Sequence, residues 1–545
     1  MLVDLTFNLH DLGLALGSLL LFIVLISVIQ YARYELRIRR IGGVRAPTLG
    51  RTPVAGALWS IGAVRAFAKH QLLEYVNENF DRVAEPGCSV VEVQMGTHER
   101  FIITREPEHM KTILTTKFND FGKGSNVYEE WKPFLGDSVF TSDGQRWHEH
   151  RGLIRPMLLK DRISDLDIFE RHTTKMIGKI ANNGGEIDMM DLFYRMTLDI
   201  TTDFLFGATS NSLDFPANEF AVAFSESQRM QMVISMLGPF AKLLPKPSYY
   251  RSIKVIDQFV APYIDAALAL PADQIEKITK SDKDFTFLHS IIQYTKDKKL
   301  LRDQLVGILI AGRDTSAATL SWTFYELSRY PDKVRRLREE ILGTVGSNRP
   351  PTYDDLKSMT YLRHTLNETL RLYPAIPYSI RTALKDSTLP GGPGKPPISV
   401  VEGDGVIYAP LSMHRRNDLY PPTSDTFEDP AIFSPERWQH WTPKAWHYIP
   451  FSGGPRICIG QNFAMTEMAF VGEFPPNPLF FDIDLLGVIE ESQSRNPNKR
   501  IVIRMLQKYE RFEYVGDWSA QYHVSELVNR PGQGVHLRFF EDKLV

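Results

Sequence analysis

The sequence contains very little cysteine. Cys88 and Cys458 are the only two among its 545 residues. Two cysteines exclude a disulfide framework, and so low a content is typical of a reducing compartment. Cys88 lies in an apolar, alternating stretch, which predicts a small buried residue rather than a reactive one.

An excess of charge of either sign is also absent. The chain has 63 Lys and Arg against 65 Asp and Glu, a formal net charge of −2. The basic surface of a nucleic-acid-binding protein is therefore not indicated, and we expect no nucleic-acid partner. Internal repeats and long low-complexity segments are missing too. With 43% hydrophobic residues, the chain can bury a large core.

One uncharged run, residues 12–29, is rich in Leu, Ile and Val and is just long enough to cross a bilayer. Four arginines follow between residues 33 and 40, which places the C-terminal side in the cytosol. We therefore predict a luminal tail over 1–11, a transmembrane anchor over 12–32 and a flexible basic, Pro/Gly-containing hinge over 33–53. A cleaved signal peptide would need a positive segment before the run and a small-residue cleavage site, and neither is found here.

The most specific pattern is F-x-x-G-x-R-x-C-x-G over residues 451–460. Its glycines and proline predict a tight loop, and residues 461–470 read as a helix whose N-terminus favours a thiolate at Cys458. A thiolate can ligate iron, and on haem it donates electron density that favours O–O cleavage. The alternative is an ordinary buried cysteine in a turn.

This stretch resembles the haem-binding loop of the cytochrome P-450 family, the haem-thiolate monooxygenases. The resemblance covers most of residues 45–540 and implies a mainly α fold with a smaller β-rich part, here over 54–545, preceded by one transmembrane helix. It also implies that Cys458 is the axial iron ligand, that Phe451 belongs to the haem loop and that Arg456 meets a haem propionate.

Two further stretches resemble the family's propionate contacts. Trp147 and Arg151 are four residues apart, so they share one face of a predicted helix over 143–157. In the family, a W-x-x-x-R helix brings both side chains to the propionates. Arg381 is a third candidate.

A long apolar helix is predicted over residues 300–330, and it contains the run Ala311-Gly312-Arg313-Asp314-Thr315. Glycine and hydroxyl side chains can bend a helix and open a groove. Asp314 and Thr315 place an acid beside an alcohol, as a proton relay requires. The run matches the family's A-G-x-D-T oxygen-activation motif and looks most like fungal members that hydroxylate alkanes and fatty acids.

Glu368 and Arg371 are three residues apart and can form an ion pair on one helix face. In the family such a pair binds an arginine that precedes the cysteine loop, and here Arg437 is that candidate. These three are expected to support the fold and not to touch substrate.

The expected substrate pocket consists of Phe118, Phe121, Met232, Ile308, Ala311, Ala375 and Ile376.

Residues 471–500 depart from the family pattern. The helix after the cysteine should continue, but this segment contains three prolines within 474–478, which cannot continue it. Joining residue 470 to residue 501 restores a continuous apolar helix face. We interpret the segment as a translated intron of ninety nucleotides. The alternative is a true loop insertion, which costs little in closure entropy.

The resemblance implies a monooxygenase that inserts one atom of O₂ into a C–H bond of a small apolar substrate, a fatty acid or alkane. Its cofactor would be haem. Electrons would come from NADPH through an external membrane-bound diflavin reductase, at the endoplasmic reticulum membrane. Two alternatives remain open: a haem-thiolate isomerase or dehydratase, and an inactive, haem-deficient product if the segment 471–500 disrupts the fold.

Overall fold

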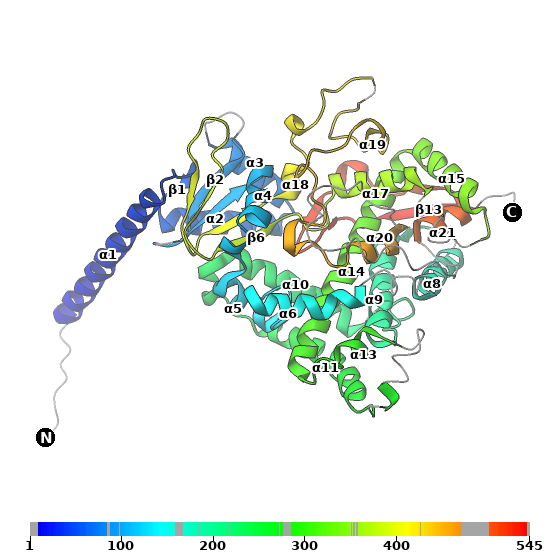
Figure 1. Ribbon diagram of the computed structural model, residues 1–545, viewed down its shortest axis with the longest axis horizontal. Helices are drawn as coiled ribbons and strands as arrows, with labels where there is room; N and C mark the ends of the chain where they lie inside the picture. The colour runs from blue at the N-terminus through cyan, green and yellow to red at the C-terminus, as the bar shows by residue number, and fades with distance from the viewer. Residues whose placement is uncertain are drawn as a thin grey trace.

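The computed structural model describes residues 9–469 and 501–541, except 84–87, 98, 159–166, 184, 217, 272, 276–284, 350, 352–354, 356–357 and 426. Figure 1 shows a large helical body, a smaller β-rich part beside it, and one long helix that projects from the β-rich part. The predicted mainly α architecture with a smaller β part is confirmed.

The helices form the larger part of the molecule, and α14 runs through the middle of it (Figure 1). They are α1 (Leu9–Arg40), α2 (Pro53–Ala68), α3 (Leu72–Asp81), α4 (Pro107–Lys111), α5 (Gly124–Leu135), α6 (Gly144–Ile154), α8 (Asp167–Asn183), α9 (Met189–Phe206), α10 (Glu219–Leu237), α11 (Pro247–Leu268), α13 (Phe287–Ile291), α14 (Lys298–Arg329), α15 (Pro331–Val345), α17 (Thr360–Leu372), α18 (Pro410–Met413), α19 (Arg437–His440), α20 (Gln461–Ala469) and α21 (Ile501–Lys508).

Within the described residues, the strands form one six-stranded sheet and three small ones. The large sheet has the order β1 (Thr48–Gly50), β2 (Val90–Gln94), β3 (Arg100–Thr104), β9 (Gly405–Tyr408), β6 (Ser379–Ala383), β4 (Phe121–Gly122). The small sheets are β10 (Tyr509–Tyr514), β13 (His536–Glu541) and β5 (Ile187–Asp188); β11 (His523–Ser525) and β12 (Asn529–Pro531); and β7 (Ser387–Leu389) and β8 (Ile398–Val400). Residues 90–95 and 100–104 alternate or run apolar on either side of Gly96-Thr97, which predicts a hairpin, and β2 and β3 form it as an antiparallel pair.

Helix α14 is the centre of the core. Asp297 caps its N-terminus, where the side-chain oxygen accepts from the Lys299 N–H at 2.9 Å. From Leu301 to Leu327 most of its side chains are buried, because α9, α11 and α17 pack around it. A helix surrounded in this way carries apolar residues on all faces, which explains its weak amphipathic pattern.

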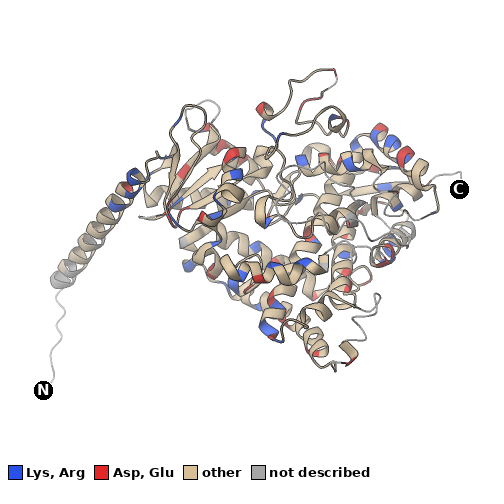
Figure 2. Cartoon of the chain, viewed as in Figure 1, with Lys and Arg blue, Asp and Glu red and all other residues tan. Residues whose placement is uncertain are grey.

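The C-terminal end of α1 is fixed to the large sheet. Tyr34 and Ile38 are buried, and the Tyr34 hydroxyl donates to Asp404. Asp404 also accepts from Arg100 at 3.0 Å, and Arg37 pairs with Asp386 at 2.7 Å. Figure 2 shows charged residues gathered where α1 meets the sheet, while the rest of the helix carries almost none.

Two sequence predictions differ from the structure. Residues 33–53 do not form the predicted hinge, because they continue α1, provide β1 and are held by buried ion pairs such as that of Arg45 with Glu92. The stretch 119–137, whose glycine and aromatic residues predict a loop, contains α5, which keeps Pro133 inside the helix. The segment 471–500 lies outside the described residues.

Candidate active site: the cysteine loop and the central helix

The cysteine loop is tight, and its glycines are required by close packing. A Cβ on Gly453 would lie 2.6 Å from the Trp446 ring, and one on Gly454 would lie 1.9 Å from the Leu114 carbonyl oxygen. The Cys458 N–H donates to the Phe451 carbonyl at 3.0 Å, which closes the loop. The loop therefore holds Cys458 in one position at the start of α20.

The Cys458 thiol is accessible, although protein surrounds it. Burial raises the pKa of this thiol, whereas the Gly460 N–H and the Arg151 guanidinium oppose that rise. An accessible side chain in protein surroundings faces an internal space. The turn residues of the loop thus direct the Gly460 backbone N–H toward the sulfur of Cys458.

Trp147 lies close to two guanidinium groups. Arg456 is 4.6 Å and Arg151 is 5.7 Å from its ring centroid, at favourable cation–π distances. Arg151 donates to the carbonyl of Ile457 at 3.0 Å, so α6 contacts the cysteine loop directly. The structure thus brings together the two residues of the W-x-x-x-R pair and the arginine of the loop.

The same region carries an excess of positive charge. Burial and the nearby charges of Arg381 and Arg456 hold the pKa of Lys123 well below its usual range. The carboxylate beside this group is Asp143, which accepts from Arg456 at 2.6 Å. Two guanidinium groups and a lysine amine beside one carboxylate favour the binding of a further anion, which would also restore the charge of Lys123.

Lys123 was not a candidate from the sequence. It is a single lysine in a loop before α5, and no motif marks it. Its role is visible only because β4 and β6 pair, which brings the start of α5 to Arg381.

One face of α14 is open over a short stretch. Ala311 is exposed in the middle of this otherwise buried helix, and Ile308 and Thr315, one turn away on either side, are partly exposed. The Thr315 hydroxyl donates to the Ala311 carbonyl at 2.7 Å. These three residues line an open strip on the central helix.

Asp314 lies on a different face from Thr315. Its carboxylate accepts from the Gln228 amide of α10 at 2.6 Å and pairs with Arg313 at 3.1 Å. Burial raises the pKa of Asp314, against the opposing effect of Arg313. The acid and the alcohol are adjacent in sequence, but they do not share one hydrogen bond.

The remaining residues predicted to line the substrate pocket lie in different parts of the structure. Ala375, with Ile376 beside it, packs against Ala318 of α14 and Val528, a residue of the β11–β12 turn that the sequence analysis missed. Met232 is one turn after Gln228 and so shares the α14-facing side of α10.

The two aromatic candidates do not line this strip. Phe118 contacts Trp147, with ring centroids 5.5 Å apart, and so belongs to the cationic cluster. Phe121 is buried in the sheet core with Ile102, Ile113 and Ala383, because β4 pairs with β6 and turns this side chain inward. The prediction of Phe121 as a pocket residue disagrees with this placement.

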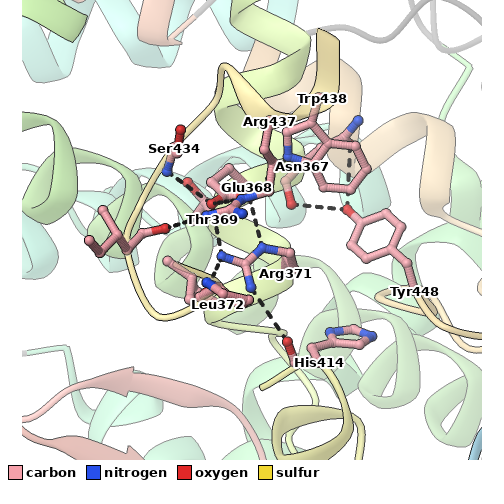
Figure 3. A network of polar contacts seen from close by, with 12 residues as sticks. Asn367, Glu368, Thr369, Arg371, Leu372, His414, Ser434, Arg437, Trp438 and Tyr448 are labelled. Carbon is pink, nitrogen blue, oxygen red and sulfur yellow. Dashed lines mark hydrogen bonds and ion pairs between the residues drawn. The ribbon is translucent and has the colours of Figure 1, made fainter. Parts of the chain in front are cut away.

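Glu368 is the centre of a buried polar network, shown in Figure 3. It pairs with Arg371 at 2.8 Å and with Arg437 at 2.9 Å, and the Trp438 indole donates to it at 3.0 Å. Burial alone would raise the pKa of Glu368, but the two arginines lower it below its usual range. Arg371 also donates to the Pro430 carbonyl at 2.7 Å, which joins α17 to the segment before the cysteine loop.

A family model described as Cytochrome P450 matches residues 53–471. The chain belongs to the cytochrome P450 family. It is 40% identical to Cytochrome P450 monooxygenase pvhE of Talaromyces variabilis, over 97% of this chain and 96% of that protein. It is 38% identical to Cytochrome P450 52A13 of Debaryomyces hansenii, over 68% of this chain and 74% of that protein, and 38% identical to Cytochrome P450 52A1 of Candida tropicalis, over 68% and 70%.

The enzyme is therefore a cytochrome P450 monooxygenase, and the family implies haem. The residues fit that group. The thiol of Cys458 faces an internal space, and a cationic cluster that could meet two propionates lies beside it. Within the described part of the chain, the buried Nε of Arg456 also has no hydrogen-bond partner.

Proposed function

We propose that this P450 hydroxylates an unactivated C–H bond of a fatty acid or an alkane. The observation that carries the proposal is the apolar strip on α14, where Ala311 is exposed between Ile308 and Thr315. Ala375, Ile376 and Val528 extend it with further apolar side chains. An alkyl chain gains about 0.8 kcal/mol for each buried CH₂ group in such surroundings. The Ala311–Thr315 run also resembles that of fungal alkane and fatty-acid hydroxylases.

The haem-binding roles follow from the same geometry. Cys458 would ligate the iron, and when bound, haem would supply the activation of O₂. Arg456, Arg151, Arg381 and Trp147 would hold the propionates. Lys123 adds an amine that would regain its positive charge beside a propionate and that the sequence did not indicate.

Protons would be handled by two residues of α14. Thr315 holds a proton at its hydroxyl, next to the exposed Ala311. Asp314 holds one at a buried carboxyl whose raised pKa favours the protonated form. Because Asp314 is bound to Gln228, it must leave that amide, or work through water, before it can resupply Thr315.

The protein would be anchored in the endoplasmic reticulum membrane by α1, with the catalytic domain in the cytosol. The segment Leu16–Arg40 is long and apolar enough to cross a membrane, and its spanning window is not covered by the rest of the protein. Electrons would come from NADPH through a separate diflavin reductase in the same membrane.

The test uses the full-length, haem-loaded enzyme in phospholipid vesicles with a diflavin reductase and NADPH. Saturated fatty acids and n-alkanes of increasing length are added, and products are identified by mass spectrometry. We expect NADPH-dependent hydroxylated products. Conversion at the same rate without NADPH would instead indicate an isomerase or dehydratase.

A matched pair of variants ties the activity to the strip. Ala311→Phe should abolish product and keep the haem-thiolate spectrum, because a ring fills the strip. Ala266→Phe, on an exposed face of α11, should change neither. Equal product from both variants would place the substrate elsewhere.

A further inference from the structure

A row of aromatic rings in contact leads from the end of α17 to the protein surface. Tyr373 and Trp322 are stacked, with ring centroids 4.0 Å apart and planes 8° from parallel. Trp322 contacts Tyr325 at 5.6 Å, and Tyr325 contacts Trp518 at 5.1 Å. Tyr373 and Trp322 are buried, whereas Trp518 is 37% exposed.

The buried end of this row lies on the same helix as the candidate active site, α14. Trp322 is seven residues after Thr315 on α14, which places it on the same helix face about 10 Å further along. Tyr373 is two residues before Ala375, which packs against Ala318 of the same helix. The indole N–H of Trp322 donates to the Asn529 carbonyl at 3.0 Å, so the row is fixed to the hairpin that contributes Val528.

Tyr373 is hydrogen-bonded to a carboxylate. Its hydroxyl donates to Glu326, a buried residue on α14. Burial raises the pKa of Glu326, so this carboxylate binds a proton more readily than an exposed one. Oxidation of a phenol releases its proton, and an acceptor already in hydrogen-bond contact lets proton and electron leave together.

The charges around Tyr373 and Glu326 favour the loss of the phenolic proton together with the electron. The Arg415 guanidinium lies 5.5 Å from the centre of the Tyr373 ring, so a phenol that kept its proton after oxidation would place a second positive charge beside it. His523 contacts both Tyr373 and Trp322, and burial lowers its pKa to about 3, so it is neutral.

We propose that Tyr373, Trp322, Tyr325 and Trp518 form an electron-transfer path that removes oxidising equivalents from the haem site when no substrate is bound. Tyr373 gives one electron to the oxidising centre and its phenolic proton to Glu326. Trp322 then reduces the tyrosyl radical, and Glu326 returns the proton. Tyr325 next gives one electron to Trp322 and its phenolic proton to water. Trp518 then gives one electron to the Tyr325 radical, which recovers a proton from water, and a small-molecule reductant such as ascorbate supplies one electron to Trp518.

Two electrons delivered along this path, together with two protons from solvent, reduce one activated oxygen atom to water. The path would therefore protect the enzyme during turnover that has become uncoupled from substrate oxidation. The nearby Arg329 guanidinium, 5.4 Å from the Trp518 ring centre, would attract an anionic reductant to the exposed end.

The experiment mixes substrate-free, haem-loaded enzyme with hydrogen peroxide and freezes the samples within milliseconds for electron paramagnetic resonance. We expect a tyrosyl or tryptophanyl radical in the parent protein and a severalfold weaker one in Tyr373→Phe. In Tyr325→Phe, oxidised side chains found by peptide mass spectrometry should accumulate at Trp322 and be depleted at Trp518.

Tyr361→Phe is the matched control, because Tyr361 is also buried and also donates to a carboxylate, that of Glu436 at 2.6 Å. A second readout is the number of peroxide additions tolerated before haem absorbance is lost, with and without ascorbate. This number should fall severalfold in Tyr373→Phe and Tyr325→Phe and stay at the parental value in Tyr361→Phe. Equal radical yields and equal haem survival in all three variants would overturn the proposal.

Discussion

At the residue scale, Cys458 is held by its loop and is accessible from inside the molecule, whereas Cys88 donates to the Val90 carbonyl at 3.0 Å beside the sheet. We expect Cys458→Ser to lose the carbon monoxide difference band of a haem thiolate and all turnover. Cys88→Ser should keep both. A thiolate-type band in the Cys458 variant would disprove the assigned ligand.

Thr315 offers a second test at this scale. Removing its hydroxyl in Thr315→Ala should leave haem binding intact and divert electrons to hydrogen peroxide, because proton delivery fails. A general acid–base contribution is about 10²–10⁴-fold. The measurement is product formed per NADPH consumed, with Thr319→Ala, one turn further along α14, as the control. An unchanged ratio in Thr315→Ala would remove Thr315 from the mechanism.

Single residues were predicted from the sequence where a motif fixes their spacing. The loop that holds Cys458 and the pair Glu368–Arg371 are of this kind, because both depend on local backbone geometry. Lys123 could not be predicted, because its effect depends on a cation from a distant strand. The direction in which the Asp314 side chain points could not be predicted either, since its partner Gln228 comes from another helix.

At the element scale, α20 contains a buried carboxyl group next to α14. Glu467 is fully buried with the Ser316 hydroxyl as a polar contact, and burial raises its pKa from 4.5 to about 8. A raised pKa means that the folded state holds the proton more tightly than the unfolded state does. Stability should therefore fall as pH rises from about 4.5 to about 8.

Glu467→Gln should remove this dependence. The shift corresponds to a cost on the order of 4 kcal/mol at pH 8, so the variant should unfold at a higher temperature there and near the parental temperature at pH 5. Thermal unfolding at both pH values measures the effect. The exposed residue Glu108 provides the control, Glu108→Gln. If the parental and Glu467→Gln curves run parallel across this pH range, the carboxyl is not buried as described.

The junction after α20 leads to the intron prediction. The family match ends at residue 471, where the anomalous segment begins, and α21 starts at Ile501, where it ends. Met468 and Ile501 are both buried in one core cluster, together with Val502, Met505, Leu506 and Tyr509. These observations support, without testing, a helix that continues directly from residue 470 to residue 501.

We expect the mature transcript to lack the ninety nucleotides that encode residues 471–500. Protein made without them should bind more haem, because the nine described residues of α20, a length that is marginal without further support, would continue directly into α21. Transcript sequencing decides the first point, and haem per protein decides the second. A main transcript that retains the segment would refute the interpretation.

Helices and strands were predicted correctly where one sequence pattern, such as alternation or a long apolar run, is strong. The β2–β3 hairpin and α14 appear where alternation and a long apolar run place them. Helix α5 was missed because its glycine, aromatic and proline residues are poor helix formers, and tertiary packing overrides that preference. The end of α1 was taken for a hinge because the carboxylates that bind it, Asp386, Glu402 and Asp404, are distant in sequence.

At the scale of the whole molecule, two truncations separate anchoring from stability. Deleting residues 1–30 should move the protein from the membrane pellet to the supernatant and keep its thermal stability, because Tyr34 and Ile38 remain. Deleting residues 1–40 should also release it, but lower its unfolding temperature by exposing Val401 and the Arg100–Asp404 pair. A full-length protein that is already in the supernatant would refute the anchor.

The firm attachment of α1 has a consequence for the approach of substrate. Because Tyr34 and Ile38 are packed against the sheet and Arg37 and Arg45 are paired, the direction of the helix axis and the orientation of the catalytic domain are coupled. A helix that crosses a bilayer would then fix which side of the enzyme faces the lipid. Molecules dissolved in the hydrocarbon layer would always meet the same side of the protein, and rotation about the membrane normal would remain its main free motion.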